Sequence, residues 1–153
     1  MEAWDRDRLF RLVPEAREFD WVDDLTPVGW LWFAGTPGQA VAYAELFWPA
    51  FVEYDGCVLL AEPDPANFRD WMASTNGDRR AVEAVLNHRH VTDLFGERGA
   101  GMSREQVVHL GRRLRDMWAA KLARDFPARR FVVSFPEDGC ESLQDYEVSF
   151  YQG

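Results

Sequence analysis

The densest group of side chains that could bind a metal is His88-Arg89-His90, with Asp93 three residues further on. Imidazole and carboxylate groups are common zinc ligands. In a helix, positions i and i+2 point about 200° apart, so His88 and His90 could share a metal only in a strand or at a helix end. The spacing matches no strong zinc motif. We therefore expect no metal, and we keep His88, His90 and Asp93 as the polar groups of an alternative ligand pocket.

Neither cysteine is placed like a nucleophile. Cys57 and Cys140 each follow a glycine in a predicted turn. A nucleophilic thiol needs a histidine or a helix N-terminus to lower its pKa, and no base stands near Cys57 in the sequence. The chain also contains no phosphate loop, dinucleotide fingerprint, HExxH or GxSxG motif. We assign no catalytic residue and expect no cofactor.

Tryptophan is the most unusual feature of the composition. Seven tryptophans cannot all be deeply buried with their N–H groups satisfied. Trp71 and Trp118 fall on apolar helix stripes, so we expect them in the core. Trp48, in Phe47-Trp48-Pro49, and one of Trp30 or Trp32 are better candidates for a surface or a pocket.

The charge is uneven along the chain. The net charge is −9, from 26 acidic and 17 basic residues, and residues 18–68 contain nine acids and no lysine or arginine. Phosphate backbones repel such a protein, so nucleic acid is not the expected partner. A protein with a basic surface is favoured, although negative charge also serves solubility alone. Our candidate interaction residues all lie in this stretch: Trp48, Glu45, Glu53, Asp55 and Trp32.

Length and hydropathy indicate the class of protein. With 153 residues, of which 47% are hydrophobic and 28% charged, the chain has the size of one globular domain, 1–153. No run approaches the roughly 18 apolar residues of a membrane span, and the charged start MEAWDRDRLF is no signal peptide. We expect a soluble, cytoplasmic, single-domain protein with no membrane partner.

Helix starts are marked by capping residues. Thr36-Pro37-Gly38-Gln39 combines an N-cap, a proline at the first helical position and a glutamine three residues after the cap. Similar signals, with an apolar stripe in the last helix, predict helices over residues 27–34, 37–47, 65–74, 79–89 and 104–125. Residues 30–33 also suit a buried strand.

Strands are predicted in two places. Asp55-Gly56 lies between β-prone runs in residues 50–62, which predicts a tight type I′ hairpin with Tyr54 opposite Cys57 and Glu53 opposite Val58. Residues 130–135 and 146–151 form the second pair. Together with the helices, these strands predict an α+β fold: one antiparallel sheet of about four strands with helices packed on one face.

These features favour a non-enzymatic, acidic protein-binding module. An inhibitor or immunity-type protein that neutralises a basic partner has this physical character. The alternative hypothesis is a small enzyme or a small-molecule-binding protein, with an aromatic-lined pocket near His88, His90 and Asp93.

Overall fold

The computed structural model describes residues 4–153 and divides the chain into two compact units, Met1–Ala44 and Glu45–Gly153. Each unit is described by itself. The first contains the α-helix α1 (Arg6–Leu12), the 3-10 helix η1 (Pro14–Phe19), α2 (Pro27–Ala34) and most of α3 (Pro37–Phe47). Its buried residues come from α1 and η1, namely Leu9, Leu12 and Ala16.

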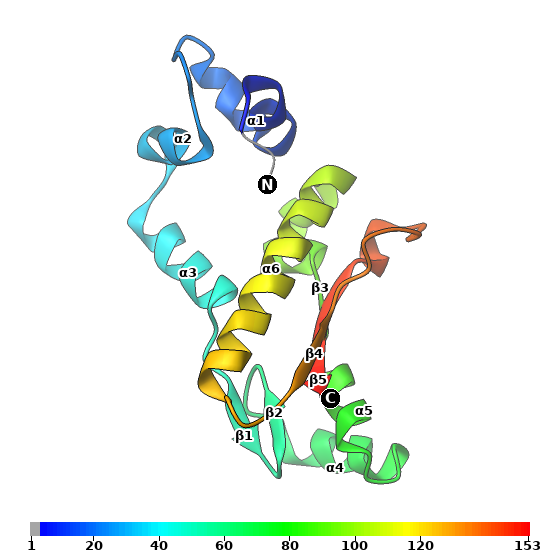
Figure 1. The fold of residues 1–153 in the computed structure, drawn as a ribbon. Coiled ribbons are helices and arrows are strands. Elements are labelled where there is room, and N and C mark those ends of the chain that lie inside the picture. The colour runs from blue at the N-terminus through cyan, green and yellow to red at the C-terminus, as the bar shows by residue number, and fades with distance from the viewer. Residues whose placement is uncertain (1–3) are drawn as a thin grey trace. The chain divides into compact units, whose positions relative to one another are not determined.

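The second unit contains both sheets. Its elements follow the chain in this order: β1 (Val52–Tyr54), β2 (Cys57–Leu59), α4 (Pro65–Ser74), α5 (Arg79–Leu86), β3 (Arg89–His90), η2 (Thr92–Gly101), α6 (Arg104–Asp125), β4 (Phe131–Ser134), η3 (Leu143–Asp145) and β5 (Glu147–Gln152). Figure 1 shows α6 lying along the strands β4 and β5. None of the helices among residues 4–153 is both long and apolar enough to cross a bilayer.

The capping signals located most helices correctly. The predictions of 27–34, 37–47, 65–74 and 104–125 are confirmed by α2, α3, α4 and α6. Ser103 and Gln106 form the reciprocal capping box at the start of α6. The prediction of 79–89 was too long, because α5 ends at Leu86 with Asn87 as its C-cap.

The α+β fold is confirmed, but its strands form two small antiparallel sheets. One has the order β1-β2 and the other β3-β5-β4, in place of one sheet of about four strands. The expectation of helices on one face was also wrong for β5. Val148 and Phe150 pack with α6, whereas the intervening Ser149 hydroxyl donates to the Ala84 carbonyl of α5 at 2.7 Å. Successive strand residues point to opposite faces, so α5 covers the face that α6 does not.

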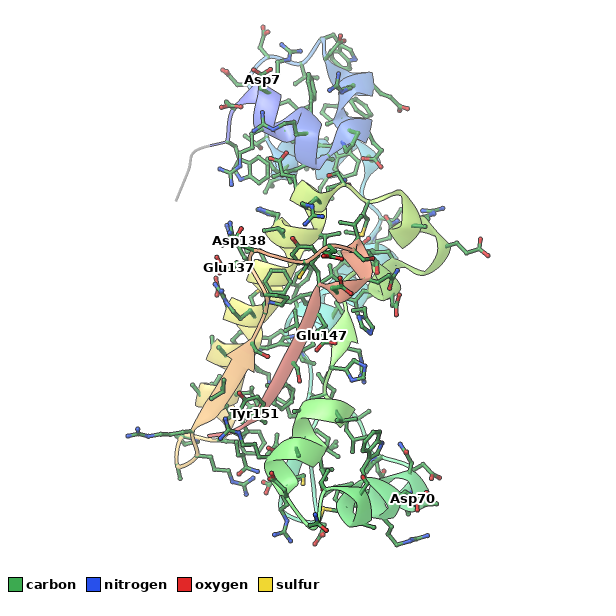
Figure 2. All side chains as sticks on the ribbon, turned by 90° about the vertical axis from the view of Figure 1, so that its right-hand side faces the viewer. Asp7, Asp70, Glu137, Asp138, Glu147 and Tyr151 are labelled. Carbon is green, nitrogen blue, oxygen red and sulfur yellow. The ribbon has the colours of Figure 1, made fainter. Side chains whose placement is uncertain are left out.

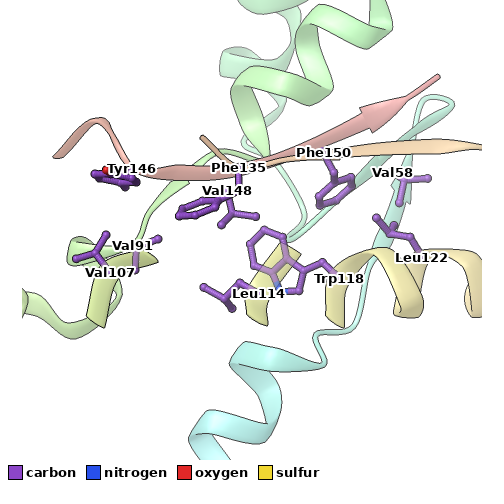
Figure 3. Close-up of a cluster of buried hydrophobic side chains, with 10 residues drawn as sticks. All are labelled: Val58, Val91, Val107, Leu114, Trp118, Leu122, Phe135, Tyr146, Val148 and Phe150. Carbon is purple, nitrogen blue, oxygen red and sulfur yellow. The ribbon is translucent and has the colours of Figure 1, made fainter. Parts of the chain in front are cut away.

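The main core lies between α6 and β5. Trp118, Leu114 and Leu122 of α6 are buried beside Val148 and Phe150, as Figure 3 shows. The indole N–H of Trp118 donates to the Leu46 carbonyl at 3.1 Å, which satisfies its only donor. Trp118 is therefore in the core, as predicted. Trp71 is 36% exposed, so its predicted core position was wrong; Phe68 instead carries the buried face of α4.

The predicted hairpin is confirmed in register and in its turn. Val52, Glu53 and Tyr54 pair with Leu59, Val58 and Cys57. Asp55 and Gly56 have φ of 46° and 80°, as a type I′ turn requires. The two faces of the hairpin enter different clusters: Cys57 and Leu59 pack with Phe68 and Val82, whereas Val58 joins the main core.

Two buried polar side chains, Glu83 of α5 and its C-cap Asn87, connect the two sheets. The carboxylate of Glu83, which is 0% exposed, accepts from Val58 N–H in β2 at 2.7 Å and from Gln152 N–H in β5 at 2.6 Å. One turn later, Asn87 accepts from Leu60 N–H at 3.0 Å and donates to the carbonyls of Val58 and Phe150 at 2.9 and 3.2 Å. These side chains supply bonds between β2 and β5 that a continuous sheet would make with its own backbone.

Replacing Gly56 by valine should destabilise the hairpin. A β-branched residue is strained at a φ of 80°, and its Cβ would lie 3.2 Å from Nε of Arg79. We expect Gly56→Val to lower the free energy of unfolding by more than about 1 kcal/mol, measured by urea denaturation. Gly101→Val, in open space with an ordinary φ, is the matched control and should change little. Equal effects of both substitutions would contradict the turn assignment.

Removing the Glu83 carboxylate should lower the free energy of unfolding by more than Gly56→Val does. Glu83→Leu leaves the N–H groups of Val58 and Gln152 buried without an acceptor, and each such group costs about 1–3 kcal/mol. The exposed Glu97→Leu should stay within about 0.5 kcal/mol of the parent protein. The measurement is again the urea midpoint, and similar losses in both variants would show that Glu83 does not bridge the sheets.

Candidate functional site

Helix α2 presents an apolar surface to solvent. It begins with Pro27 at its first position and Thr26 as N-cap, whose hydroxyl accepts from Gly29 N–H at 3.0 Å. The sequence PVGWLWFA contains no charged residue, and none of its side chains is buried. Trp32 is 87% exposed and Val28 is 77% exposed. A contiguous apolar face of this kind on a protein surface marks a site of interaction.

A cavity of about 470 Å³ lies beside this face, between α2 and the start of α3. Its lining includes Trp30, Leu31, Trp32, Gln39, Ala40 and Tyr43. The Nε1 atom of Trp30 is buried and has no hydrogen-bond partner among residues 4–153. Buried N–H groups are nearly always bonded, so the unused donor of Trp30 is unusual. We call this cavity the α2–α3 groove.

The acidic stretch is joined to α2 by aromatic contacts. Phe19 stacks on Phe33 with ring centroids 5.1 Å apart, and Trp21 meets Phe33 edge-on at 6.0 Å. The four acids of this stretch that belong to the first unit are all exposed, namely Glu18, Asp20, Asp23 and Asp24. The first unit therefore combines an apolar face with a run, residues 18–44, that contains four acids and no base, and Arg6 lines the same cavity as Asp23 and Asp24.

The other predicted interaction residues lie in the second unit. The carboxylates of Glu53 and Asp55 have basic partners within the chain: Glu53 lies 2.5 Å from Arg129, and Asp55 lies 3.7 Å from Arg79. Glu45 is exposed, and Trp48 is half-buried. Trp32, by contrast, lines the α2–α3 groove together with Trp30. Sequence reasoning offered one of Trp30 or Trp32 as a candidate and selected Trp32, and it did not find the donor that Trp30 leaves unused.

The structure brings the two histidines together. His88 lies just beyond the end of α5 and His90 lies in β3, with ring centroids 5.3 Å apart. The third residue of the cluster is Glu147, because β3 pairs with β5 so that His90 faces Glu147. One ligand atom from each of His88, His90 and Glu147 lies within 4.8 Å of the others. Figure 2 marks Glu147 on β5 beside β3, while the predicted third member, Asp93, is exposed on η2 and outside this cluster.

Backbone carbonyls orient both imidazole rings. Nδ1 of His88 lies 2.5 Å from the Val85 carbonyl, and Nδ1 of His90 lies 2.6 Å from the Gln144 carbonyl. A carbonyl oxygen can only accept, so each Nδ1 carries a hydrogen and donates it. In the neutral rings the lone pair is then on Nε2. The neighbouring Arg89 donates to the carbonyls of Leu86 and His88, and burial lowers the pKa of its guanidinium.

Cys57 has the properties of a packing residue. It is completely buried, and burial, followed by the negative charge of Glu83, raises the pKa of its thiol to about 11. A thiol in this environment stays protonated near neutral pH and is a poor nucleophile. Cys140 is half-buried, and its sulfur lies 3.8 Å from the Asp145 carbonyl.

No protein-family model, curated protein or solved structure matches this chain.

Thiol reactivity should separate the two cysteines. In a Cys140→Ser variant, the native protein should react with a disulfide reagent at pH 8 at least about a hundredfold more slowly than after unfolding, since a pKa of about 11 in place of 9.0 reduces the thiolate accordingly. The reverse variant, Cys57→Ser, should stay reactive when folded. Fast modification of native Cys140→Ser would show that Cys57 is accessible and activated.

Proposed function

We propose that this chain is a non-enzymatic protein-binding module whose α2–α3 groove receives an apolar segment of a protein with a basic surface. The observation that carries the proposal is the exposure of Trp32, at 87%, on an uncharged helix beside a cavity. Exposed aromatic side chains next to a groove are typical anchors of protein interfaces, where tryptophan is enriched among the residues that dominate affinity.

The charges support a basic partner. Glu18, Asp20, Asp23 and Asp24 are exposed on the unit that carries the groove, and residues 18–44 contain no base. In such an interface the charges chiefly set the association rate, whereas the buried aromatic groups set the lifetime of the complex. Glu53 and Asp55 contribute less to this field, because Arg129 and Arg79 lie beside them.

The occupant proposed for the groove is a peptide segment with one large apolar side chain flanked by lysine or arginine. The apolar side chain fills the space between Trp30, Trp32 and Tyr43, and a backbone carbonyl of the segment accepts from the free Nε1 of Trp30. An inhibitor or immunity-type protein that blocks a basic partner would use such a site. This proposal moves the central anchor from Trp48 to Trp32.

The anchor can be tested by capture followed by kinetics. Parent and Trp32→Ala proteins are used in parallel as bait in an extract of the native host, and a protein retained only by the parent is purified for surface-based binding. Trp32→Ala should speed dissociation by about thirtyfold, equivalent to ~2 kcal/mol, if Trp32 is a hot spot. Trp71→Ala, at an exposed tryptophan of the second unit, should bind like the parent.

A separate variant tests the role of the acidic residues in the proposed interface. Asp23→Asn combined with Asp24→Asn should slow association and flatten its dependence on salt, with little change in dissociation. An acidic partner, or binding that tightens with added salt, would contradict the charge argument. A larger effect of Trp48→Ala than of Trp32→Ala on dissociation would return the anchor to Trp48, and unfolding of Trp32→Ala would show that Trp32 is a core residue.

A further inference from the structure

We propose that His88, His90 and Glu147 form a binding site for a divalent zinc-type ion, in which both imidazoles bind through Nε2. This inference is independent of the α2–α3 groove and replaces our expectation that the two histidines bind no metal. Its basis is the convergence of two imidazoles and one carboxylate within 4.8 Å from two distant stretches of the chain: residues 88–90, between α5 and η2, and β5.

The hydrogen bonds of the imidazoles are those of metal-binding histidines. A ligating histidine almost always donates its other ring N–H to a carbonyl or a carboxylate, which fixes the tautomer and the ring orientation. Here Val85 and Gln144 provide these acceptors at 2.5 and 2.6 Å. The Gln144 carbonyl belongs to η3, which is held by a reciprocal capping box between Ser142 and Asp145. Both rings are thus oriented before any ion binds.

The ligand atoms of the three side chains must move slightly closer together to bind one ion. Metal–ligand bonds of about 2.0–2.1 Å in a tetrahedral site place ligand atoms about 3.3 Å apart, less than the 4.8 Å limit observed here. Glu147 can supply part of the movement, because its side chain is 45% exposed. Its carboxylate must turn from the Nδ1 side of the His90 ring, where it lies at 4.0 Å, toward Nε2.

The ligand set indicates the kind of ion and the kind of site. Two imidazoles with one carboxylate suit zinc and other late first-row divalent ions, and disfavour magnesium and calcium, which prefer oxygen ligands. Three protein ligands leave one position of a tetrahedral ion open to water or to another molecule. Such openness is the property of catalytic zinc sites and not of structural ones, which are closed by four protein ligands.

Zinc titration of the complete chain tests the site. Isothermal calorimetry with zinc chloride should show one equivalent bound by the parent protein. His88→Gln, His90→Gln and Glu147→Gln should each weaken binding by more than about tenfold. His109→Gln is the matched control, because His109 lies on α6 outside the cluster, and it should keep the parent affinity. Asp93→Asn tests the carboxylate that the sequence suggested and should also bind like the parent.

A second measurement is made on the parent protein, so it does not depend on whether the variants fold. In the parent protein with labelled imidazole nitrogens, one equivalent of zinc should shift the Nε2 resonances of two histidines and leave the third histidine unchanged. Bound zinc should also raise the melting temperature of the parent but not of Glu147→Gln. The proposal would be overturned if zinc did not bind stoichiometrically, or if the main shifts were at Nδ1. It would also be overturned if Asp93→Asn lost zinc affinity and Glu147→Gln did not.

Discussion

The second unit depends on one buried carboxylate and one buried amide on the same face of α5. Glu83 accepts from β2 and from β5, and Asn87, the C-cap of α5 four residues later, donates to the same two strands. Removing a charged group from water costs several kcal/mol unless it is fully bonded. Any displacement of α5 from either strand would leave a buried charge and buried N–H groups without partners. The two sheets thus stay together although no backbone ladder joins β2 to β5 among the described residues.

The same constraint positions the histidine pair. Asn87, the C-cap of α5, bonds the Phe150 carbonyl, and His88 is the first residue beyond this cap. β5 continues from Phe150 back to Glu147, whose partner in β3 is His90. All three side chains are therefore placed by elements that the Glu83–Asn87 bonds hold, and sites built on strands and helix ends keep their geometry better than sites on free loops.

The sequence predicted what short-range chemistry determines. N-caps such as Thr36 and Ser103, and the Asp55-Gly56 turn, act over three or four residues, so the helices and the hairpin register could be read directly. The features that the sequence could not predict depend on pairing between residues that are far apart in the chain. β3 has two residues and exists only because β5, nearly 60 positions later, pairs with it, and without that register Glu147 has no visible relation to His90. The structural role of Glu83 was missed because acidic residues usually lie on solvated faces. Its only signal in the sequence was its position between Val82 and Leu86, on a helix that is followed by Asn87.

The acids near the α2–α3 groove also explain how an apolar helix can remain exposed. An uncharged face carrying Trp32 and Val28 would favour pairing between copies of the chain through the hydrophobic effect. Two such faces would bring the exposed acids of residues 18–24 together, and like charges across an interface oppose association. A basic partner meets the same apolar face without this repulsion. In the proposed complex, the negative charge would discriminate between a second copy and a basic protein by penalising the wrong complex, while the aromatic surface would supply the attraction that both share.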